Sequence, residues 1–231
     1  MKKRWTKRIV ILSIVLSLGY IAFRMRYEIS EYVLAMFGSE IPVNPRPENM
    51  STVEWAELNY SDEMKKLSKK HDVPYEYLMA LVILECGGDK PAGHRYEPSI
   101  MKRLKRVKDG KVDRLENIYQ HHLQNCDDGC LENLATSWGP FQLMGYKAIP
   151  LGVSVTDLRH EDDAAEVGVE WIAQEYGHFL KKKKYKDAFH YHNTGQRFPL
   201  SGRPKTHSPY YVSDGLKYMK IFEKRKNQNP S

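Results

Sequence analysis

A single glutamate offers the clearest chemistry in this sequence. Glu85 follows an apolar run from Tyr77 to Leu84, and Gly87 and Gly88 just after it are the usual signal for a helix C-terminus. Apolar neighbours and the negative helix end both disfavour a carboxylate, so we expect the pKa of Glu85 to be raised. A carboxyl group that stays protonated near neutral pH can protonate a leaving-group oxygen, as glycosidic bond cleavage requires. The alternative is a glutamate that ends an ordinary buried helix.

A second candidate segment lies later in the chain. The sequence from Ser137 to Gly145 reads SWGPFQLMG and places small residues beside aromatic ones and a single amide. Such a composition suits a backbone that approaches a ligand closely, with Trp138 and Gln142 to recognise it. Trp138 and Phe141 are candidates for stacking on a ligand, and each fits a place in the core equally well.

Four segments in this order resemble the lysozyme-like superfamily of peptidoglycan-cleaving enzymes, in its soluble lytic transglycosylase, goose-type lysozyme and phage muramidase branches. The first two are the helix-end Glu85 and the segment 137–145, which is similar to a Gly-x-x-Gln-x-Met loop. Segment 189–195 resembles the Ala-Tyr-Asn-x-Gly motif, and segment 209–212, with the sequence after it, resembles a Tyr-Val segment and closing helix. The resemblance spans about residues 61–223.

The resemblance implies a mainly α-helical, lysozyme-like single domain and a role for individual residues. Glu85 would be the general acid. The residues that would bind or position the substrate are Ser137, Trp138, Gln142, Met144, Tyr191, Asn193 and Tyr211. We expect no cofactor and no metal ion.

Glu97 is the candidate for a second catalytic carboxylate. The segment 93–100 around it resembles the part of phage-type N-acetylmuramidases in which a second glutamate follows an aromatic residue, although its distance from Glu85 is shorter here. The aspartate that follows the glutamine loop of goose-type lysozymes is missing from segment 144–147, which leaves Glu97 as the substitute. A hydrolase needs such a group to direct water or to stabilise an oxocarbenium-like transition state. Otherwise Glu97 is a surface group that pairs with a neighbouring arginine or lysine.

These residues predict a muramidase that cuts the MurNAc-(β1,4)-GlcNAc linkage of peptidoglycan. In a hydrolase, water attacks with the help of Glu97. In a lytic transglycosylase, the sugar's own 6-hydroxyl attacks and leaves a 1,6-anhydroMurNAc end, so Glu85 suffices. Glu97 favours hydrolysis, whereas Asn193 and Tyr211 match transglycosylase positions. A catalytically silent wall-binding module of an envelope apparatus is a further alternative, and Glu85 argues against it.

Two of the three cysteines enclose a short loop. A disulfide can join Cys126 to Cys130 in an exported protein. His121 and His122 lie nearby, but a zinc site would need more ligands at a better spacing.

Cys86 remains as a free thiol beside the proposed acid. As a nucleophile it would need His94, His190 or His192 as its base. The matched segments favour Glu85 instead, with Cys86 at the place of a small residue.

The N-terminus has the composition of a membrane-targeting segment. Five basic residues stand among the first eight, and the uncharged run IVILSIVLSLGYIAF follows. Its length is at the upper end for the apolar region of a signal peptide and slightly short for a membrane span. The basic excess before the run places the N-terminus in the cytoplasm. We therefore expect export, either with an uncleaved anchor at the periplasmic face of the inner membrane or with secretion after cleavage.

The expected organisation has four parts: residues 1–37 as basic stub, signal segment and juxtamembrane stretch, 38–60 as proline-rich linker, 61–225 as catalytic domain and 226–231 as polar tail. Inside the catalytic domain we expect no strands, and helices over residues 61–70, 74–85, 113–124, 160–180, 185–191 and 208–224.

The net charge of +7 includes the five basic residues of the N-terminus. Two runs of basic residues stand out in the rest of the chain, in segments 102–108 and 181–184. These clusters favour a solvated face, or attraction to an anionic wall or membrane, over nucleic-acid binding. We expect a monomer whose partners are peptidoglycan and, through an uncleaved N-terminal segment, the membrane.

Overall fold

The computed structural model describes residues 45–228. The chain divides into two units after Val43, and the description below concerns the second. The expected signal or anchor segment 1–37 lies outside the described residues. Within residues 45–228, no helix combines the length and the apolar character that crossing a bilayer requires.

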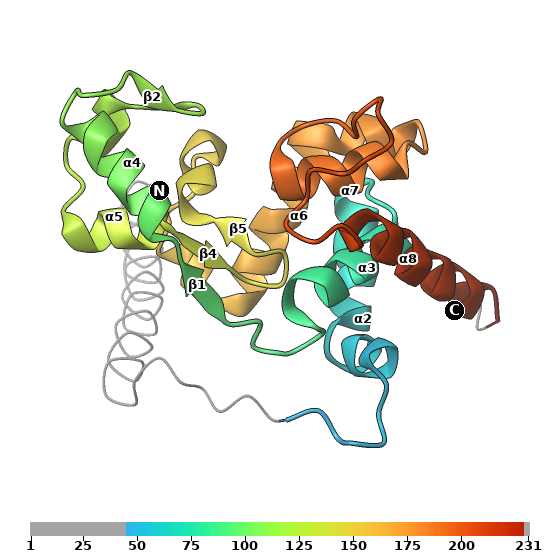
Figure 1. The fold of residues 1–231 in the computed structure, drawn as a ribbon. Helices are drawn as coiled ribbons and strands as arrows, with labels where there is room; N and C mark the ends of the chain where they lie inside the picture. Colours follow the sequence, from blue (N-terminus) through green and yellow to red (C-terminus); the bar gives the residue numbers. More distant parts are fainter. Residues whose placement is uncertain (1–44, 229–231) are drawn as a thin grey trace, which may run out of the picture. The chain divides into compact units, whose positions relative to one another are not determined.

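Five helices form the larger part of the unit, and one of them, α3, is buried (Figure 1). They are α2 (Thr52–His71), α3 (Tyr75–Cys86), α6 (Glu161–Lys181), α7 (Tyr185–Thr194) and α8 (Tyr211–Gln228). Helix α3 packs between α2 and α8, and every residue from Tyr77 to Ile83 is buried. This helix is apolar on all sides because neighbours cover all of them.

A second group of short elements forms a smaller core. It comprises α4 (Pro98–Lys108), the hairpin β2 (Arg114–Leu115) and β3 (Ile118–Tyr119), the 3-10 helix η1 (Gln120–Leu123) and α5 (Asp128–Leu134). Two further 3-10 helices, η2 (Gly145–Leu151) and η3 (Asp157–Arg159), lead from this group to α6.

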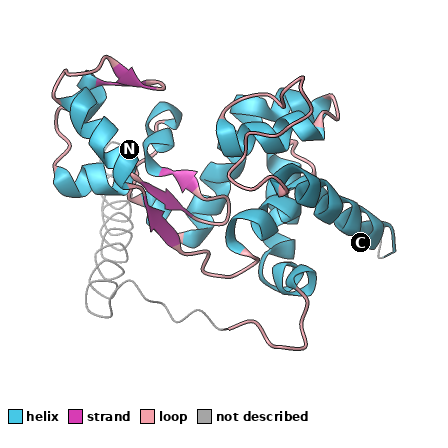
Figure 2. Cartoon of the chain, viewed as in Figure 1, coloured by secondary structure: helices cyan, strands magenta, loops and turns pink. Residues whose placement is uncertain are grey.

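A three-stranded antiparallel sheet lies between the two groups of helices (Figure 2). Its strands are β1 (His94–Tyr96), β4 (Thr136–Trp138) and β5 (Leu143–Met144), with β4 in the middle. In this register Ser137 is paired with Arg95 on one side and with Met144 on the other. The sheet therefore brings the segment after Glu85 next to the SWGPFQLMG segment.

The described unit is mainly helical, as expected, and four predicted helices appear as α3, α6, α7 and α8 with small shifts at their ends. The expectation of no strands was wrong, because each strand has only two or three residues and so shows no alternating pattern.

The predicted start of the first helix at Ser61 was also wrong. Helix α2 begins at Thr52, where Ser51 and Glu54 form a reciprocal capping box. Trp55 and Tyr60 are buried in its first half, so residues 52–60 belong to the folded unit and the linker is shorter than expected.

The predicted helix over residues 113–124 was wrong as well. The chain turns at Glu116, which has a positive φ of 50°, and β2 and β3 pair across this turn. The hairpin buries Leu115 and Ile118 together against the smaller core, which supports this turn over a helix.

Candidate active site

Glu85 lies in the last turn of α3, which ends at Gly87 in the left-handed conformation. Its side chain is only 14% exposed. Burial raises the pKa of Glu85 to about 7, while a hydrogen bond from Tyr211 and the charge of Arg95 act in the opposite direction. A large fraction of this carboxyl group is therefore protonated at neutral pH, in agreement with the direction expected from the sequence.

Tyr211, the first residue of α8, donates its hydroxyl proton to Oε1 of Glu85. The side chain of Tyr211 is buried, and burial together with the charge of Glu85 raises its own pKa well above the ordinary tyrosine value. Tyr211 therefore stays a neutral donor, which favours the ionised form of Glu85.

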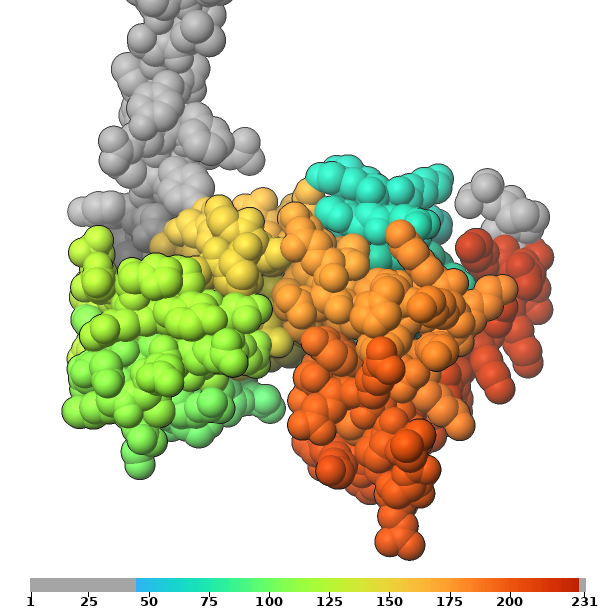
Figure 3. All heavy atoms as spheres, turned by 90° about the horizontal axis from the view of Figure 1, so that it is seen from above, coloured from blue at the N-terminus to red at the C-terminus, as the bar shows by residue number. Residues whose placement is uncertain are grey.

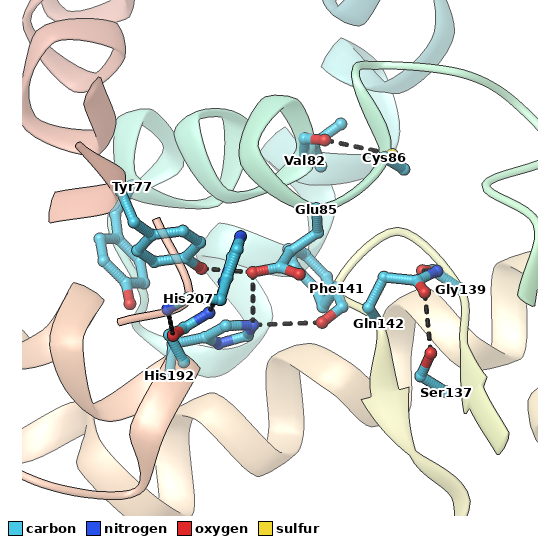
Figure 4. A network of polar contacts seen from close by, with 12 residues as sticks. Tyr77, Val82, Glu85, Cys86, Ser137, Gly139, Phe141, Gln142, His192 and His207 are labelled. Atoms are coloured by element: carbon cyan, nitrogen blue, oxygen red, sulfur yellow. Dashed lines mark hydrogen bonds and ion pairs between the residues drawn. The ribbon is translucent and has the colours of Figure 1, made fainter. Parts of the chain in front are cut away.

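His192 lies on the other side of the same carboxyl oxygen, with its Nε2 atom 3.6 Å from Oε1 of Glu85 (Figure 4). Nε2 contacts the carbonyl oxygen of Phe141 at 3.1 Å, and a carbonyl only accepts, so the ring proton is on Nε2. Nδ1 then accepts from the hydroxyl of Tyr176 at 2.7 Å, and Tyr77 donates to Tyr176 at 3.2 Å. Burial lowers the pKa of His192 to about 4, so the ring is neutral.

The sequence analysis did not place His192 next to Glu85. It named this residue only as a possible base for Cys86. The available signal was its position next to Asn193 in a matched segment, but the partners Tyr77 and Tyr176 come from other helices and are brought close only by the fold.

The loop between β4 and β5 is held by Gln142, which has a positive φ of 46°. Its Oε1 accepts from the hydroxyl of Ser137 at 2.8 Å, and its Nε2 donates to the carbonyls of Gly139 at 3.1 Å and Gly93 at 3.4 Å. Both polar ends of the amide therefore already have protein partners. We infer that Ser137 and Gln142 shape the wall of the site.

Two glycines let this loop lie against α6. A Cβ atom on Gly139, whose φ is +67°, would stand 2.5 Å from the Cβ of Ala164. A Cβ on Gly168 of α6 would stand 2.6 Å from the ring of Phe141. This close approach places the Phe141 carbonyl beside His192.

The aromatic residues of the same segment differ in their surroundings. Phe141 is buried in the larger core, so it is not available for stacking on a ligand. Trp138 is half-buried, donates from Nε1 to the carbonyl of Asn133 at 3.0 Å and stacks on His94 with ring centroids 5.3 Å apart. Met144 packs, half-buried, against the smaller core.

Asn193 contacts the loop that leads to Tyr211. Its Nδ2 donates a hydrogen bond to Nδ1 of His207 at 2.7 Å, and its Oδ1 accepts one from the backbone N–H of His207 at 3.2 Å. His207 in turn lies edge-on to Tyr211, with centroids 5.4 Å apart. Tyr191 points elsewhere, with its hydroxyl 3.5 Å from Glu175. Asn193 thus contacts a neighbour of Tyr211, whereas Tyr191 packs its ring on that of Tyr176, with centroids 5.4 Å apart.

Glu97 also lies outside the network of hydrogen bonds around Glu85 in the described chain. It stands at the N-terminal end of α4 and pairs with Nε of Arg95 at 2.7 Å. The positive charge of Arg95 also lowers the pKa of Glu85. Arg95, which the sequence did not single out, therefore acts electrostatically on both candidate carboxyl groups.

The structure argues against Cys86 as a nucleophile. Its thiol donates to the carbonyl of Val82 at 3.1 Å, and burial raises its pKa to about 12. Of the possible bases, His190 is used to hold the backbone of Gln196 and Lys205, and His94 stacks on a tryptophan.

Cys126 and Cys130 form a disulfide with their Cα atoms 5.2 Å apart, and Cys86 is free, as the sequence predicted. Nowhere in residues 45–228 do three or more metal-binding side chains gather around a possible ion site.

The disulfide gives a prediction. We expect one free thiol when unreduced, denatured protein is titrated with a thiol reagent. Reduction should lower the free energy of unfolding by about 1–2 kcal/mol, because the loop is short. A titration that finds three thiols would contradict the pairing.

The arrangement has the properties of a general acid site. A carboxyl group with a pKa of about 7 lies at the end of a buried helix, and two neutral donors, Tyr211 and His192, stand beside one of its oxygens. Such a group can give up a proton at neutral pH, after which the donors can stabilise the anion.

A comparison of the chain with models of protein families, with curated proteins and with solved structures finds no match.

Proposed function

We propose that this protein is an exported muramidase with a lysozyme-like fold that hydrolyses the MurNAc-(β1,4)-GlcNAc linkage of peptidoglycan. The observation that carries the proposal is the buried Glu85, whose pKa of about 7 makes it both protonated and able to give up its proton near neutral pH. The four ordered segments that resemble peptidoglycan-cleaving enzymes give the substrate class.

In the proposed reaction, Glu85 transfers its proton to the glycosidic oxygen while the bond from that oxygen to C1 of MurNAc breaks. The bonding electrons leave with the GlcNAc oxygen, and positive charge develops on the MurNAc ring. A water molecule then bonds to C1, and its proton passes to a second carboxylate. The product carries a reducing MurNAc end.

The surroundings of Glu85 can stabilise the carboxylate that forms when it gives up its proton. The hydroxyl of Tyr211 already contacts Oε1, and the Nε2–H of His192 points to the Phe141 carbonyl with Oε1 only 3.6 Å away. A small rotation of the carboxylate would bring Oε1 within hydrogen-bond distance of this second donor. Hydrogen bonds to charged groups contribute about 1.5–3 kcal/mol each, so these donors lower the cost of leaving a charge in a buried place.

Glu97 is our candidate for the second carboxylate. Arg95 holds it by an ion pair and also acts on Glu85, so Arg95 connects the two groups electrostatically. The arginine side chain is 75% exposed and has room to move when a glycan strand binds.

The same ion pair favours a second candidate function, lytic transglycosylation. If Glu97 stays paired with Arg95, Glu85 is the acid without a partner base, and the 6-hydroxyl of MurNAc attacks C1 instead of water.

Digestion of purified peptidoglycan tests the proposal and separates the two reactions. We expect soluble fragments with reducing ends; anhydro ends would indicate transglycosylation, and undigested wall would leave only a binding role.

The hydrogen bond from Tyr211 gives a prediction for the pH dependence. It favours the anion of Glu85, so Tyr211→Phe should raise the pKa of Glu85 and move the alkaline limb of the activity profile to higher pH. The maximal rate should fall about tenfold, the lower end of what a hydrogen bond to a charge contributes. The exposed neighbour Tyr210 supplies the control Tyr210→Phe, which should keep the wild-type profile. Identical profiles for all three proteins would contradict a role for Tyr211 in setting this pKa.

A further inference from the structure

A basic groove lies on the surface between α7 and α8, on a face of α8 that the active site does not use. It has a volume of about 620 Å³, and its lining includes Lys186 of α7 and, from α8, Leu216, Lys217, Lys220, Ile221 and Lys224. Helix α8 turns a different set of side chains inward, among them Tyr211, Met219 and Phe222.

The lysines form one continuous stripe. Lys217, Lys220 and Lys224 are three and four residues apart, so they lie above one another on one face of the helix. All three are exposed, as is Lys186 across the groove. None of the four forms an ion pair with a carboxylate of residues 45–228, and even Glu223 is no partner. Four lysines without an ion-pair partner in this part of the chain give the groove a local positive charge.

Apolar side chains accompany this charge. Leu216 and Ile221 are half-buried within the groove. Lys186 lies 5.9 Å from the ring centroid of Phe198, which connects the groove to the loop that carries the fully exposed Leu200. Residues near position 200, coloured orange-red in Figure 3, project from the body of the unit. Lysines beside exposed leucine are typical of surfaces that lie on a bilayer interface.

We propose that this groove and its lysine stripe dock the folded unit on anionic phospholipid headgroups. Each basic side chain near such a surface contributes about 1 kcal/mol, and the apolar side chains fit the boundary between headgroups and acyl chains. The sequence places the bilayer within reach, because the expected apolar segment precedes the folded unit by a short stretch of chain. The inference does not depend on the proposed hydrolysis.

Amine footprinting of the full chain tests this proposal. The protein is reconstituted in vesicles of phosphatidylcholine alone, or with roughly one third phosphatidylglycerol, and acetylation of each lysine is followed by mass spectrometry. In the anionic vesicles we expect Lys186, Lys217, Lys220 and Lys224 to react about fivefold more slowly, and high salt to remove the difference. Lys102, an exposed lysine in the basic run of α4, is the matched control and should react alike in both.

A triple variant, Lys217→Gln with Lys220→Gln and Lys224→Gln, should lose the protection of Lys186 while keeping wild-type activity on purified peptidoglycan. Equal labelling in the two kinds of vesicle would overturn the proposal. Equal protection of Lys102 would also overturn it, because the effect would then be a general attraction of basic residues. Protection by purified wall material in phosphatidylcholine vesicles, but not by phosphatidylglycerol, would assign the groove to the wall instead.

Discussion

Replacement of Glu85 by glutamine is expected to lower the cleavage of purified peptidoglycan by about 10²–10⁴-fold, the usual contribution of a general acid. Glutamine has nearly the same shape, and its carbonyl oxygen can still accept the hydrogen bond from Tyr211, but it cannot give up a proton at neutral pH. The rate of release of soluble fragments from purified sacculi measures the effect. Binding to the same sacculi, measured by co-sedimentation, should be unchanged.

The matched control is Glu132→Gln, which makes the same substitution at an exposed glutamate on α5. This variant should keep wild-type activity. If Glu85→Gln retained activity within about threefold of wild type, far from the 10²-fold minimum, the assignment of the acid would be wrong.

Thermal unfolding separates the loss of the acid from a loss of the fold. Because the folded-state pKa of Glu85 is raised to about 7, the unfolded chain releases this proton at lower pH than the folded chain does. Stability therefore falls as the pH rises from about 4.5 to about 7, and the loss remains above that range. Glu85→Gln removes this loss, so we expect the variant to melt higher than wild type at pH 8. A lower melting temperature at pH 8 would show instead that the substitution disturbs the packing.

Replacement of Glu97 by glutamine is expected to have the second largest effect, a loss of about 10²-fold if this carboxylate directs water. The reaction products must be analysed together with the rate. A folded and active Glu97→Gln variant that releases 1,6-anhydro ends would contradict hydrolysis and leave Glu85 as the single catalytic carboxyl group.

Arg95→Gln is the control that distinguishes a catalytic Glu97 from a structural one. If Glu97 served only as the partner of Arg95, removing either side of the ion pair should have the same effect on activity. In our account the loss of Glu97 is far more severe. Arg95→Gln should mainly shift the alkaline limb of the pH profile upward, because the charge of Arg95 lowers the pKa of Glu85.

Local patterns were sufficient to predict the most important element of the site. The apolar run that ends at Glu85 predicted both the buried helix α3 and the direction of the pKa shift, since both follow from the burial of one short segment. The wide apolar stripe of α6 and the short cysteine loop were predictable for the same reason.

Features that depend on distant segments were not predictable. The neutral state of His192 results from burial against α6 and the loop between β4 and β5, and its ring orientation depends on Tyr176 and on the Phe141 carbonyl. The pairing of Glu97 with Arg95, by contrast, is local and is the alternative that the sequence left open for Glu97. The short hairpin at Glu116 carried too few residues for any periodic pattern to appear.

The central claim is that Glu85 protonates a peptidoglycan glycosidic bond that water then cleaves. Mass spectrometry of muropeptides released from purified peptidoglycan by the wild type and by Glu85→Gln tests it most directly. We predict fragments with reducing MurNAc ends from the wild type and no new fragments from the variant. The same fragments in similar amounts from both proteins, or no fragments from either, would contradict the claim.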